Sequence, residues 1–538
     1  MDEKQSEFYS QENKGNLPEL IYADLKKDYS NYKLYYKLGK YLEDKNINQA
    51  FLCMENAEFF CTDEEAKIQI RTEKERMAQK EDYGVRPVAI VILSYNLKQI
   101  CIQCVESVRK NNLPDSYEII AVDNASSDGI CEWLQEQEDI TLIRNQQNVG
   151  FPAGCNQGIQ AAGNQDILIL NNDIELQPNS VFCLRMGLYE SGQVGAAGCV
   201  TNYAGNGQAV HKNNFSIEEW RNYAKETNVP CENPYECKFY LGGFALLLRH
   251  GLLEQIGMFD ERFSPGYYED TDLGIRIARA GCKQLLCRNS FVLHYGSASF
   301  QAEDKTNQLA VNKQKIIDKW GFDIEYYSEL RQELIEMIDQ KPEAPIRVLE
   351  VGCGCGSTLA RIKALWPNAV VKGIEVVWDI AQIGKSLADI CQGDIESMDL
   401  PYENGYFDYI ICGDVLEHLK EPQKTLQRLK PCLKKNGLLL ASIPNVTHMS
   451  VILGLLKGTA RYQEAGILDK THLRFFTQKT AINLFQEAGF QIVAMSGILD
   501  RRCWLQEEQL IGDILKLPGI ADENSFMVSQ YLLKALCL

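Results

Sequence analysis

The sequence predicts an α/β protein in which two parallel-sheet domains follow a short all-helical segment. Between residues 86 and 320, and again after residue 345, runs rich in Val, Ile and Leu alternate with stretches of helical periodicity. Before residue 86, the apolar residues recur at helical spacing. We therefore predict a helical segment at 1–85, an α/β domain at 86–320, a helix and linker at 321–345, and a second α/β domain at 346–538.

The composition argues against several functional classes. The chain has 73 acidic and 55 basic residues, a net charge of −18, and no basic stripe, so we expect no nucleic-acid partner. It has no run of about 18 apolar residues, which predicts a cytoplasmic protein that is not transmembrane. Its 19 cysteines should then be reduced. Cys101 and Cys104 have redox spacing, but without a second pair a structural role is favoured.

The helical segment carries the small and large residues of a helix hairpin. Tyr35, Leu38 and Gly39 are followed by Ala50 and Met54 at the spacing of two packed helices. The pattern resembles one degenerate tetratricopeptide-type repeat. Because a single repeat cannot bury its own apolar face, we expect the segment to pack on the following domain or on a protein partner.

Small and polar residues follow the predicted strands of the first α/β domain. Residues 88–93, 117–122 and 166–170 are buried-strand patterns. In a parallel sheet their carboxyl ends meet at one edge, where ligands bind. The residues just after these strands suit a nucleotide pocket; they are Ser94, Tyr95, Asn96, Asp123, Asn124, Asn171, Asn172 and Asp173.

Five motifs in this domain carry a family resemblance. They are V-A-I-V-I-L-S-Y-N, V-D-N-A-S-S-D-G, N-V-G-F-P-A-G-C-N, I-L-N-N-D and G-Y-Y-E-D-T-D-L, in that order. Together they resemble an inverting family 2 glycosyltransferase of the Rossmann-like GT-A fold. The resemblance implies a nucleotide-diphosphate sugar as donor and a glycan or glycoprotein as acceptor. It implies that the eight strand-end residues bind the donor, together with Gly243 in the predicted strand at 238–248 and Glu269.

The resemblance also implies a metal ion, Mg²⁺ or Mn²⁺, on the donor diphosphate. Asp173 matches the last acid of the family's D-x-D motif, while Asn171 stands where the first acid often does. A divalent cation there neutralises charge on the departing diphosphate. His294 ends a later predicted strand, and both a ligand role and a structural role remain open for it.

The carboxylates of Glu269, Asp270 and Asp272 lie where a helix is predicted to begin. Carboxylates at this position are often plain helix caps. In the family, the second residue of the E-D pair is the general base, so Asp270 would take the proton from the acceptor hydroxyl. We expect the helix dipole to keep Asp270 ionised. The N-N-D and Y-E-D patterns resemble rhamnosyltransferase-type members, which suggests a deoxysugar donor.

The second α/β domain opens with a strand and a glycine-rich turn, Val351-Gly352-Cys353-Gly354-Cys355-Gly356. Such a turn alone could also bind a dinucleotide. The acids at the ends of the next strands decide the choice, and together the stretches resemble a class I S-adenosylmethionine (SAM) dependent methyltransferase, another Rossmann-like fold. The resemblance implies SAM binding by Glu350, Gly352, Gly354, Gly356, Glu375, Asp394, Ile395 and Asp414.

The methyl acceptor is indicated by Asp414, Glu417 and His418, with His472 later in the chain. This acid-x-x-Glu-His pattern resembles the Mg²⁺ site of small-RNA terminal 2′-O-methyltransferases and a region of ubiquinone-pathway O-methyltransferases. A metal held by these four residues would lower the pKa of a chelated hydroxyl. Asp414 is shorter than the usual Glu. The alternatives are that Glu417 and His418 contact the substrate, with His418 as the base, or that they are structural.

Three functions are therefore open. The first is a bifunctional transferase that adds a sugar and O-methylates a sugar hydroxyl. The second keeps one active domain and uses the other as a binding scaffold. The third is an assembly module led by the N-terminal helices, with both catalytic domains degenerate; the presence of Asp123, Asp173, Asp270 and Glu350 disfavours it.

Overall fold

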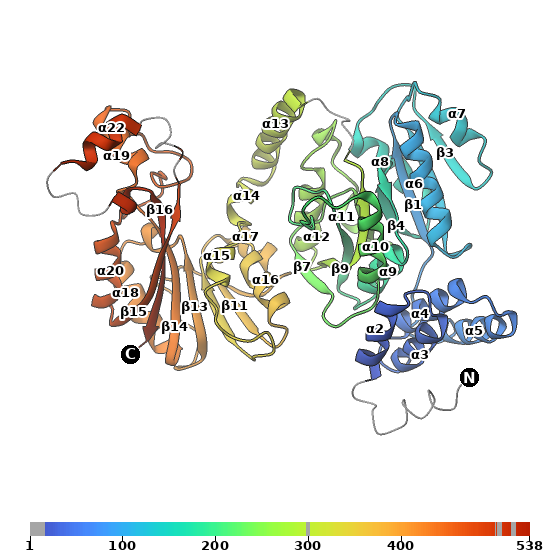
Figure 1. Ribbon diagram of the computed structural model, residues 1–538, viewed down its shortest axis with the longest axis horizontal. Coiled ribbons are helices and arrows are strands. Elements are labelled where there is room, and N and C mark those ends of the chain that lie inside the picture. The colour runs from blue at the N-terminus through green and yellow to red at the C-terminus, as the bar shows by residue number, and fades with distance from the viewer. Residues whose placement is uncertain (1–16, 297–301, 501, 503–507, 518–522, 538) are drawn as a thin grey trace. The chain divides into compact units, whose positions relative to one another are not determined.

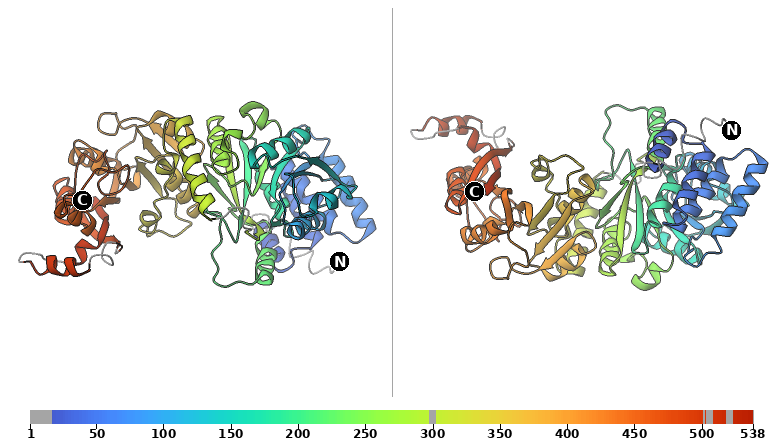
Figure 2. Two further views of the ribbon diagram at one scale, coloured as in Figure 1. Left: turned by 90° about the horizontal axis from the view of Figure 1, so that it is seen from above. Right: turned by 90° about the horizontal axis from the view of Figure 1, so that it is seen from below.

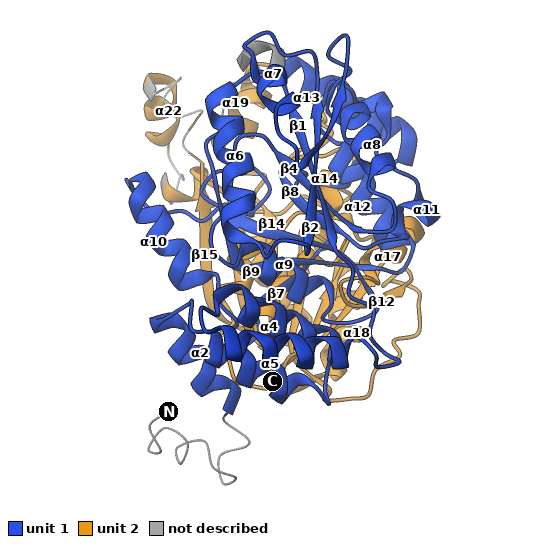
Figure 3. Ribbon diagram, turned by 90° about the vertical axis from the view of Figure 1, so that its right-hand side faces the viewer, with its two compact units in different colours: residues 1–324 blue, residues 325–538 orange. Residues whose placement is uncertain are grey.

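The computed structural model describes residues 17–296, 302–500, 502, 508–517 and 523–537 (Figure 1). The chain forms two compact units, residues 1–324 and residues 325–538 (Figure 3). We call them unit 1 and unit 2 and describe each by itself. The predicted α/β class is confirmed in both.

Four helices begin unit 1: α2 (Leu17–Lys27), α3 (Tyr32–Leu42), α4 (Ile47–Phe60) and α5 (Glu64–Met77). The α3 and α4 helices form the predicted hairpin, and they approach closely at Gly39. A Cβ atom at Gly39 would lie 2.9 Å from the Met54 side chain and 3.0 Å from the Ala50 carbonyl oxygen. Only glycine fits this crossing without a shift of the neighbours.

The helical segment packs on the domain that follows it. Its apolar residues share one core with strand β1 (Val88–Ser94) and helix α9 (Ser180–Leu188). The Asn56 side-chain amide donates to the Asn179 Oδ1 atom at 3.1 Å. Arg185 pairs with Glu55, and both are largely buried. The apolar face of the hairpin is therefore covered within the chain itself.

A nine-stranded mixed sheet forms the centre of unit 1, in the order β3-β2-β1-β4-β8-β6-β9-β5, with β7 also paired to β9. Strands β3, β2, β1 and β4 are parallel, whereas β8 is antiparallel to both β4 and β6. Alternate β1 residues face two separate cores, so helices cover both faces of the sheet (Figure 2). The strands not yet bounded are β2 (Tyr117–Asp123), β3 (Ile140–Arg144), β4 (Asp166–Asn171), β5 (Ile174–Glu175), β6 (Val194–Thr201), β7 (Tyr235–Lys238), β8 (Ala245–Leu248) and β9 (Lys283–His294).

The strand predicted over residues 238–248 is broken in the structure. β7 ends at Lys238 and β8 begins at Ala245, and residues 239–244 form a loop between them. The Gly242–Gly243 pair lies in this loop, because two residues without side chains weaken a strand. The other helices of unit 1 are α6 (Lys98–Asn111), α7 (Ile130–Gln135), α8 (Phe151–Ala161), α10 (Ile217–Thr227), α11 (Leu252–Ile256), α12 (Glu269–Arg279) and α13 (Ala302–Trp320).

Unit 2 is built on a seven-stranded sheet in the order β12-β11-β10-β13-β14-β16-β15. The first five strands are parallel, and β16 runs antiparallel to both β14 and β15, which agrees with the predicted terminal pair. The strands are β10 (Arg347–Val351), β11 (Val370–Glu375), β12 (Asp389–Gln392), β13 (Phe407–Gly413), β14 (Leu433–Pro444), β15 (Phe490–Leu499) and β16 (Val528–Cys537).

The segment predicted as helix and linker contributes to the core of unit 2. Leu334, Ile335 and Ile338 pack there with Val348 of β10 and Ile362. The helices of this unit are α14 (Ile324–Tyr327), α15 (Gln332–Ile335), α16 (Ser357–Leu365), α17 (Trp378–Gly384), α18 (Pro422–Leu429), α19 (Met449–Leu456), α20 (Gln478–Glu487) and α22 (Glu508–Leu515).

Among the helices that the structure describes, none is long and apolar enough to cross a membrane. The cysteines within the described ranges are free thiols, and most of them are buried, Cys101 and Cys104 included. Burial raises the pKa of the Cys101 thiol to about 12, which fits a structural role.

We predict that Tyr35→Phe destabilises unit 1 by about 1–3 kcal/mol, because the buried Asn179 amide loses its acceptor and the Tyr29 carbonyl loses its shorter hydrogen bond. The Tyr35 hydroxyl donates to the Tyr29 carbonyl at 2.8 Å and accepts from the Asn179 amide at 2.9 Å. Urea unfolding measures the change, and Tyr36→Phe on the same helix is the control. Equal effects of the two substitutions would contradict the prediction.

Candidate active sites

The structure brings the predicted strand-end residues of unit 1 together at one edge of the sheet. Ser94 is in register with Asp123 across β1 and β2. The Asn124 N–H donates to the Ser94 carbonyl at 2.8 Å, and the Asn172 side chain donates to the Asn96 carbonyl at 3.2 Å. Tyr95 and Asn171 lie at the ends of strands β1 and β4 in the same edge.

Asp123 is the most deeply buried carboxylate of this group, with 1 % of its surface exposed. Its Oδ2 atom accepts from the Ser126 N–H at 3.2 Å. Its Oδ1 atom accepts no hydrogen bond from the described residues. A buried acceptor of this kind is costly unless a ligand supplies a donor. Asp123 is therefore suited to an N–H or O–H group of a bound nucleoside.

Asp173 and His294 form a second pair at this edge. The Asp173 Oδ2 and His294 Nε2 atoms lie 3.2 Å apart. The His294 Nδ1 atom lies 2.9 Å from the Tyr203 carbonyl oxygen, so the Nδ1–H group donates there and Nε2 is the ring nitrogen that faces Asp173. The Phe244 ring stacks on the imidazole. A carboxylate and an imidazole nitrogen placed side by side are ligand types that a divalent cation accepts.

The loop before α12 is held in a strained conformation. Tyr267 and Tyr268 have φ angles of 76° and 72°, in the left-handed region. The side-chain amide of the buried Asn312, on α13, donates to the carbonyl oxygens of Phe263, Gly266 and Tyr267 at 2.7, 2.8 and 3.0 Å. This one amide therefore fixes the approach of the chain to Glu269 and Asp270.

Three acids at the start of α12 have different surroundings. Asp272 is fully buried and pairs with Arg276 at 2.9 Å and with the Trp320 indole N–H at 3.0 Å, so it is structural. The Asp270 carboxylate accepts from the Thr271 N–H at 2.7 Å and from the Gly243 N–H at 3.4 Å. The Glu269 Oε2 atom is buried and accepts no hydrogen bond from the described residues.

Burial separates the roles of Glu269 and Asp270. It raises the pKa of Glu269 well above its usual value, and the Asp270 charge adds to that shift. Burial also raises the pKa of Asp270, although the Thr271 and Gly243 N–H groups oppose it. The helix dipole alone predicts a lowered pKa, so desolvation outweighs the dipole here. Glu269 thus holds the proton, and the Asp270 carboxylate is a stronger base than an exposed one.

In unit 2, the glycine-rich turn is tied to the end of β11. The Glu375 carboxylate accepts from the Gly354 and Val377 N–H groups, both at 2.9 Å. Gly354 has φ 52°, and a Cβ atom there would lie 2.2 Å from the Tyr327 carbonyl oxygen. That carbonyl accepts from the Cys355 N–H at 2.7 Å. A side chain at position 354 is therefore excluded both by conformation and by space. Gly352 and Gly356 also have positive φ.

The remaining predicted SAM-binding residues surround this turn. Burial raises the pKa of Glu350 to about 8, and its Oε2 atom accepts no hydrogen bond from the described residues. Ile395 is buried, whereas Asp394 is exposed and its carboxylate accepts from the Glu396 N–H at 2.9 Å.

Asp414 is committed to a partner that the sequence did not indicate. Its carboxylate lies 2.9 Å from the Arg331 guanidinium and accepts from the Ser442 hydroxyl at 2.8 Å and from the Gln530 amide. The Arg331 backbone N–H in turn donates to the Thr358 hydroxyl at 3.2 Å. Asp414 thus neutralises a cation beside the glycine-rich turn.

Glu417, His418 and His472 form a cluster without Asp414. One ligand atom from each lies within 4.8 Å of the other two. Glu417 is 1 % exposed, and neither carboxylate oxygen accepts a hydrogen bond from the described residues. The His472 Nδ1 atom lies 3.0 Å from the Ile467 carbonyl, which leaves Nε2 facing Glu417 at 3.9 Å. Burial lowers the pKa of His418, which favours its neutral, ligating form. The cluster therefore fits a divalent cation.

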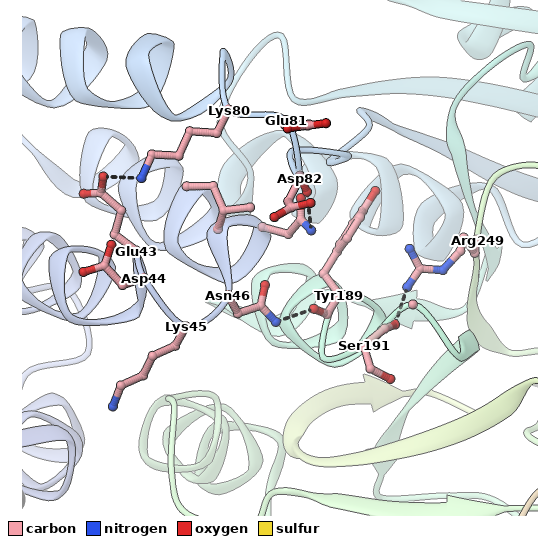
Figure 4. A pocket seen from close by; sticks show the side chains of 13 residues that line it. Glu43, Asp44, Lys45, Asn46, Lys80, Glu81, Asp82, Tyr189, Ser191 and Arg249 are labelled. Atoms are coloured by element: carbon pink, nitrogen blue, oxygen red, sulfur yellow. Dashed lines mark hydrogen bonds and ion pairs between the residues drawn. The ribbon is translucent and has the colours of Figure 1, made fainter.

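A cavity of about 560 Å³ lies between the helical segment and the following domain (Figure 4). None of the predicted site residues lines it. Several of its polar groups are paired: Lys80 with Glu43 at 2.7 Å, Asn46 with the Tyr189 carbonyl at 2.8 Å, and Arg249 with the Ser191 carbonyl at 3.0 Å. We assign no chemistry to it.

Comparison with known families matches the two parts of the chain to two different families. Residues 89–255 match the profile of Glycosyl transferase family 2, and residues 320–495 match the profile of a Methyltransferase domain. The chain joins a family 2 glycosyltransferase domain to a methyltransferase domain. The first match ends before Asp270 and His294, so their assignment rests on geometry and motif alone.

Curated relatives match one domain each. The N-acetylglucosaminyl-diphospho-decaprenol L-rhamnosyltransferase of Mycobacterium tuberculosis is 25 % identical over 223 residues, 36 % of this chain and 71 % of that protein. The ubiquinone biosynthesis O-methyltransferase of Glaesserella parasuis is 31 % identical over 138 residues, 22 % of this chain and 58 % of that enzyme. The malonyl-[acyl-carrier protein] O-methyltransferase of Halalkalibacterium halodurans is 27 % identical over 126 residues, 21 % of this chain. The chain spans 46 % of this last enzyme.

Sequence reasoning missed four residues that shape these two sites. In the glycosyltransferase domain, Asn312 fixes the loop before Asp270, and the Tyr203 carbonyl orients His294. In the methyltransferase domain, Tyr327 and Arg331 come from the segment predicted as helix and linker, ahead of the second α/β domain. Each of these four residues acts through a contact with a residue far away in the sequence, and such contacts produce no local sequence motif.

We predict that Glu269→Gln stabilises the glycosyltransferase domain increasingly as pH rises. Because the pKa of Glu269 is raised in the folded state, this residue retains its proton on folding. The resulting contribution to the free energy of unfolding is lost as pH rises above the ordinary pKa of 4.5 toward the pKa of the folded state. Glutamine keeps the shape and removes that loss. Thermal unfolding of both proteins at about pH 5 and about pH 8 measures the difference in stability between the variant and the parent. A gap that narrows with rising pH would contradict the assignment of the proton.

Proposed function

We propose that the glycosyltransferase domain transfers a deoxyhexose, with inversion, from a nucleotide-diphosphate donor to a hydroxyl of a glycan. The observation that carries this proposal is the Asp270 carboxylate beside the buried Glu269 at the start of α12, on a loop fixed by Asn312. Support for the sugar comes from the rhamnosyltransferase relative, which also suggests a lipid-linked diphosphate glycan as acceptor. A glycoprotein acceptor is the alternative.

Asp270 acts as the general base in this scheme. It accepts the proton of the acceptor hydroxyl while that oxygen bonds to the anomeric carbon and the bond to the diphosphate oxygen breaks. Ser94, Asn96, Asp123 and Asn124 would hold the nucleoside. Asp173 and His294 would hold Mg²⁺ or Mn²⁺, which when bound offsets the charge of the leaving diphosphate. The 3.2 Å distance between Asp173 Oδ2 and His294 Nε2 supports this assignment, as does the Tyr203 carbonyl that orients the ring.

We further propose that the methyltransferase domain methylates a sugar hydroxyl with SAM. The glycine-rich turn and Glu375 would bind the cofactor, with Glu350, Asp394 and Ile395 around it. Glu417, His418 and His472 would hold a divalent cation, which when bound lowers the pKa of the acceptor hydroxyl. The two unpartnered oxygens of Glu417 support this arrangement. Asp414 orients Arg331 in this scheme and does not bind the metal.

We predict that Asp270→Asn lowers sugar transfer by at least about a hundredfold, because a general base typically contributes that much or more. Release of nucleoside diphosphate from a panel of nucleotide sugars measures the rate. Methyl transfer should persist in this variant.

The matched variant for that test is Gly354→Arg, which should lose SAM binding and keep sugar transfer. An Asp270→Asn protein with unchanged sugar transfer would refute the base. If only one of the two activities is found in the parent protein, the other domain is a binding scaffold.

We predict two separable metal sites. Manganese binding, followed by electron paramagnetic resonance, should lose one class of ion in His472→Ala and the other in His294→Ala, while His211→Ala, at an exposed histidine, keeps both. Chelation of the metal should stop methyl transfer. Methyl transfer that survives chelation but is lost in His418→Ala would instead make His418 the base.

A further inference from the structure

The methyltransferase unit carries an apolar surface that neither reaction uses. Among the described residues, 21 large hydrophobic side chains are exposed, and ten of them lie between residues 455 and 517. Single exposed apolar side chains are normal on a folded protein. Three of the most exposed of them, Leu455, Leu456 and Tyr462, lie within one helix end and the loop after it, and clustered exposed apolar side chains are typical of interaction sites.

The end of α19 and the loop after it form the centre of this surface. Met449 and Leu453 of α19 face inward, where they pack with Ile511 of α22. At the end of the helix, Leu455 and Leu456 are 62 % and 64 % exposed, and Tyr462 in the loop is 68 % exposed. We call residues 455–462 the cap tip. Every residue of the cap tip is exposed.

The cap tip lies at the carboxyl edge of the sheet. β14 ends at Pro444, before α19, and β15 ends at Leu499, before α22. Both strands are antiparallel to β16, so these ends lie at the same edge (Figure 1). Glu417 and His418 follow β13, which is parallel to β14. The cap tip and the metal cluster therefore share one edge of the domain.

The charge around the cap tip is opposite to that of the whole chain. Residues 445–480 contain five Lys or Arg and two Asp or Glu, whereas the chain has a net charge of −18. Lys457 and Arg461 lie within the cap tip and are exposed. An acidic protein is repelled from an anionic surface except where its cations gather. The positive charge near the cap tip therefore favours an anionic partner that binds at this face of the protein.

We propose that the cap tip docks this protein on the surface of an anionic lipid bilayer. Leu455, Leu456 and Tyr462 would enter the boundary between headgroups and acyl chains, and Lys457 and Arg461 would meet the lipid phosphates. Exposed leucine and tyrosine beside lysine and arginine suit this depth, because the long cationic side chains reach back to the headgroups. This proposal concerns binding to a membrane surface, and it does not depend on the reactions proposed above.

A second copy of the chain is the rival occupant, and the charges disfavour it. A two-fold contact through the cap tip would gather Lys457 and Arg461 from both copies at one interface. Like charges in close contact raise the free energy of association. Phosphate headgroups instead complement these cations. If the acceptor is lipid-linked, as proposed above, docking would present it to the edge that holds Glu417 and His418.

Vesicle flotation of the full chain tests the docking. The protein should float with phosphatidylcholine vesicles that contain phosphatidylglycerol, and should not float with phosphatidylcholine alone. Leu455→Glu with Leu456→Glu should lower the bound fraction about tenfold. Ile68→Glu, at a side chain of α5 that is 61 % exposed, is the matched control and should bind like the parent. Lys457→Glu with Arg461→Glu should remove the preference for anionic lipid.

Each variant is also checked for SAM binding by calorimetry, which should be unchanged because none of these residues is placed in either reaction. Failure of the parent protein to float with anionic vesicles overturns the proposal, as does flotation of the double leucine variant at the parent level. If the parent protein is a dimer that does not bind vesicles, and the double leucine variant is a monomer, the surface binds a second copy of the chain instead.

Discussion

Removing a carboxylate from water without supplying donors for its oxygens costs free energy, and both domains of this chain accept that cost. Asp123 and Glu269 in unit 1, and Glu350 and Glu417 in unit 2, each have a buried oxygen with no hydrogen-bond donor among the described residues. Asp123 lies at a strand end, Glu269 lies beside Asp270, Glu350 lies beside the glycine-rich turn, and Glu417 lies beside two histidines. A ligand, a retained proton or a cation is what offsets such burial.

That constraint explains why the surrounding loops are held so firmly. A buried acid keeps its perturbed protonation only while water stays excluded, so the backbone next to it must not relax. Asn312 uses one amide group on three carbonyl oxygens around the Asp270 loop, and Arg331 anchors Asp414 beside the SAM turn. Both side chains belong to segments outside the strand-end motifs. The residues that hold the buried acids in place are therefore different from the residues proposed to react.

The sequence predicted what local patterns encode. Strand runs, the residues that follow them and the glycine-rich turn are local, and the sheets confirm the α/β class with two such domains. The broken strand at residues 239–244 was not foreseen, because hydrophobicity continues through Gly242 and Gly243. The direction of the Asp270 pKa was also missed, since a helix start is visible in sequence whereas the burial around it is not. Asn312, Tyr327 and Arg331 act across the fold and have no motif.

The Tyr327 carbonyl has a consequence for how such fused enzymes can be recombined. It bonds to the Cys355 N–H of the SAM turn, 28 positions after it by residue number, and it precedes the Pro342 and Pro345 pair that marks the sequence boundary. A domain exchanged at those prolines would lack the Tyr327 carbonyl that holds its glycine-rich turn. A methyltransferase domain that is moved to another protein therefore has to start before α14, although composition alone places the domain boundary later, at the two prolines.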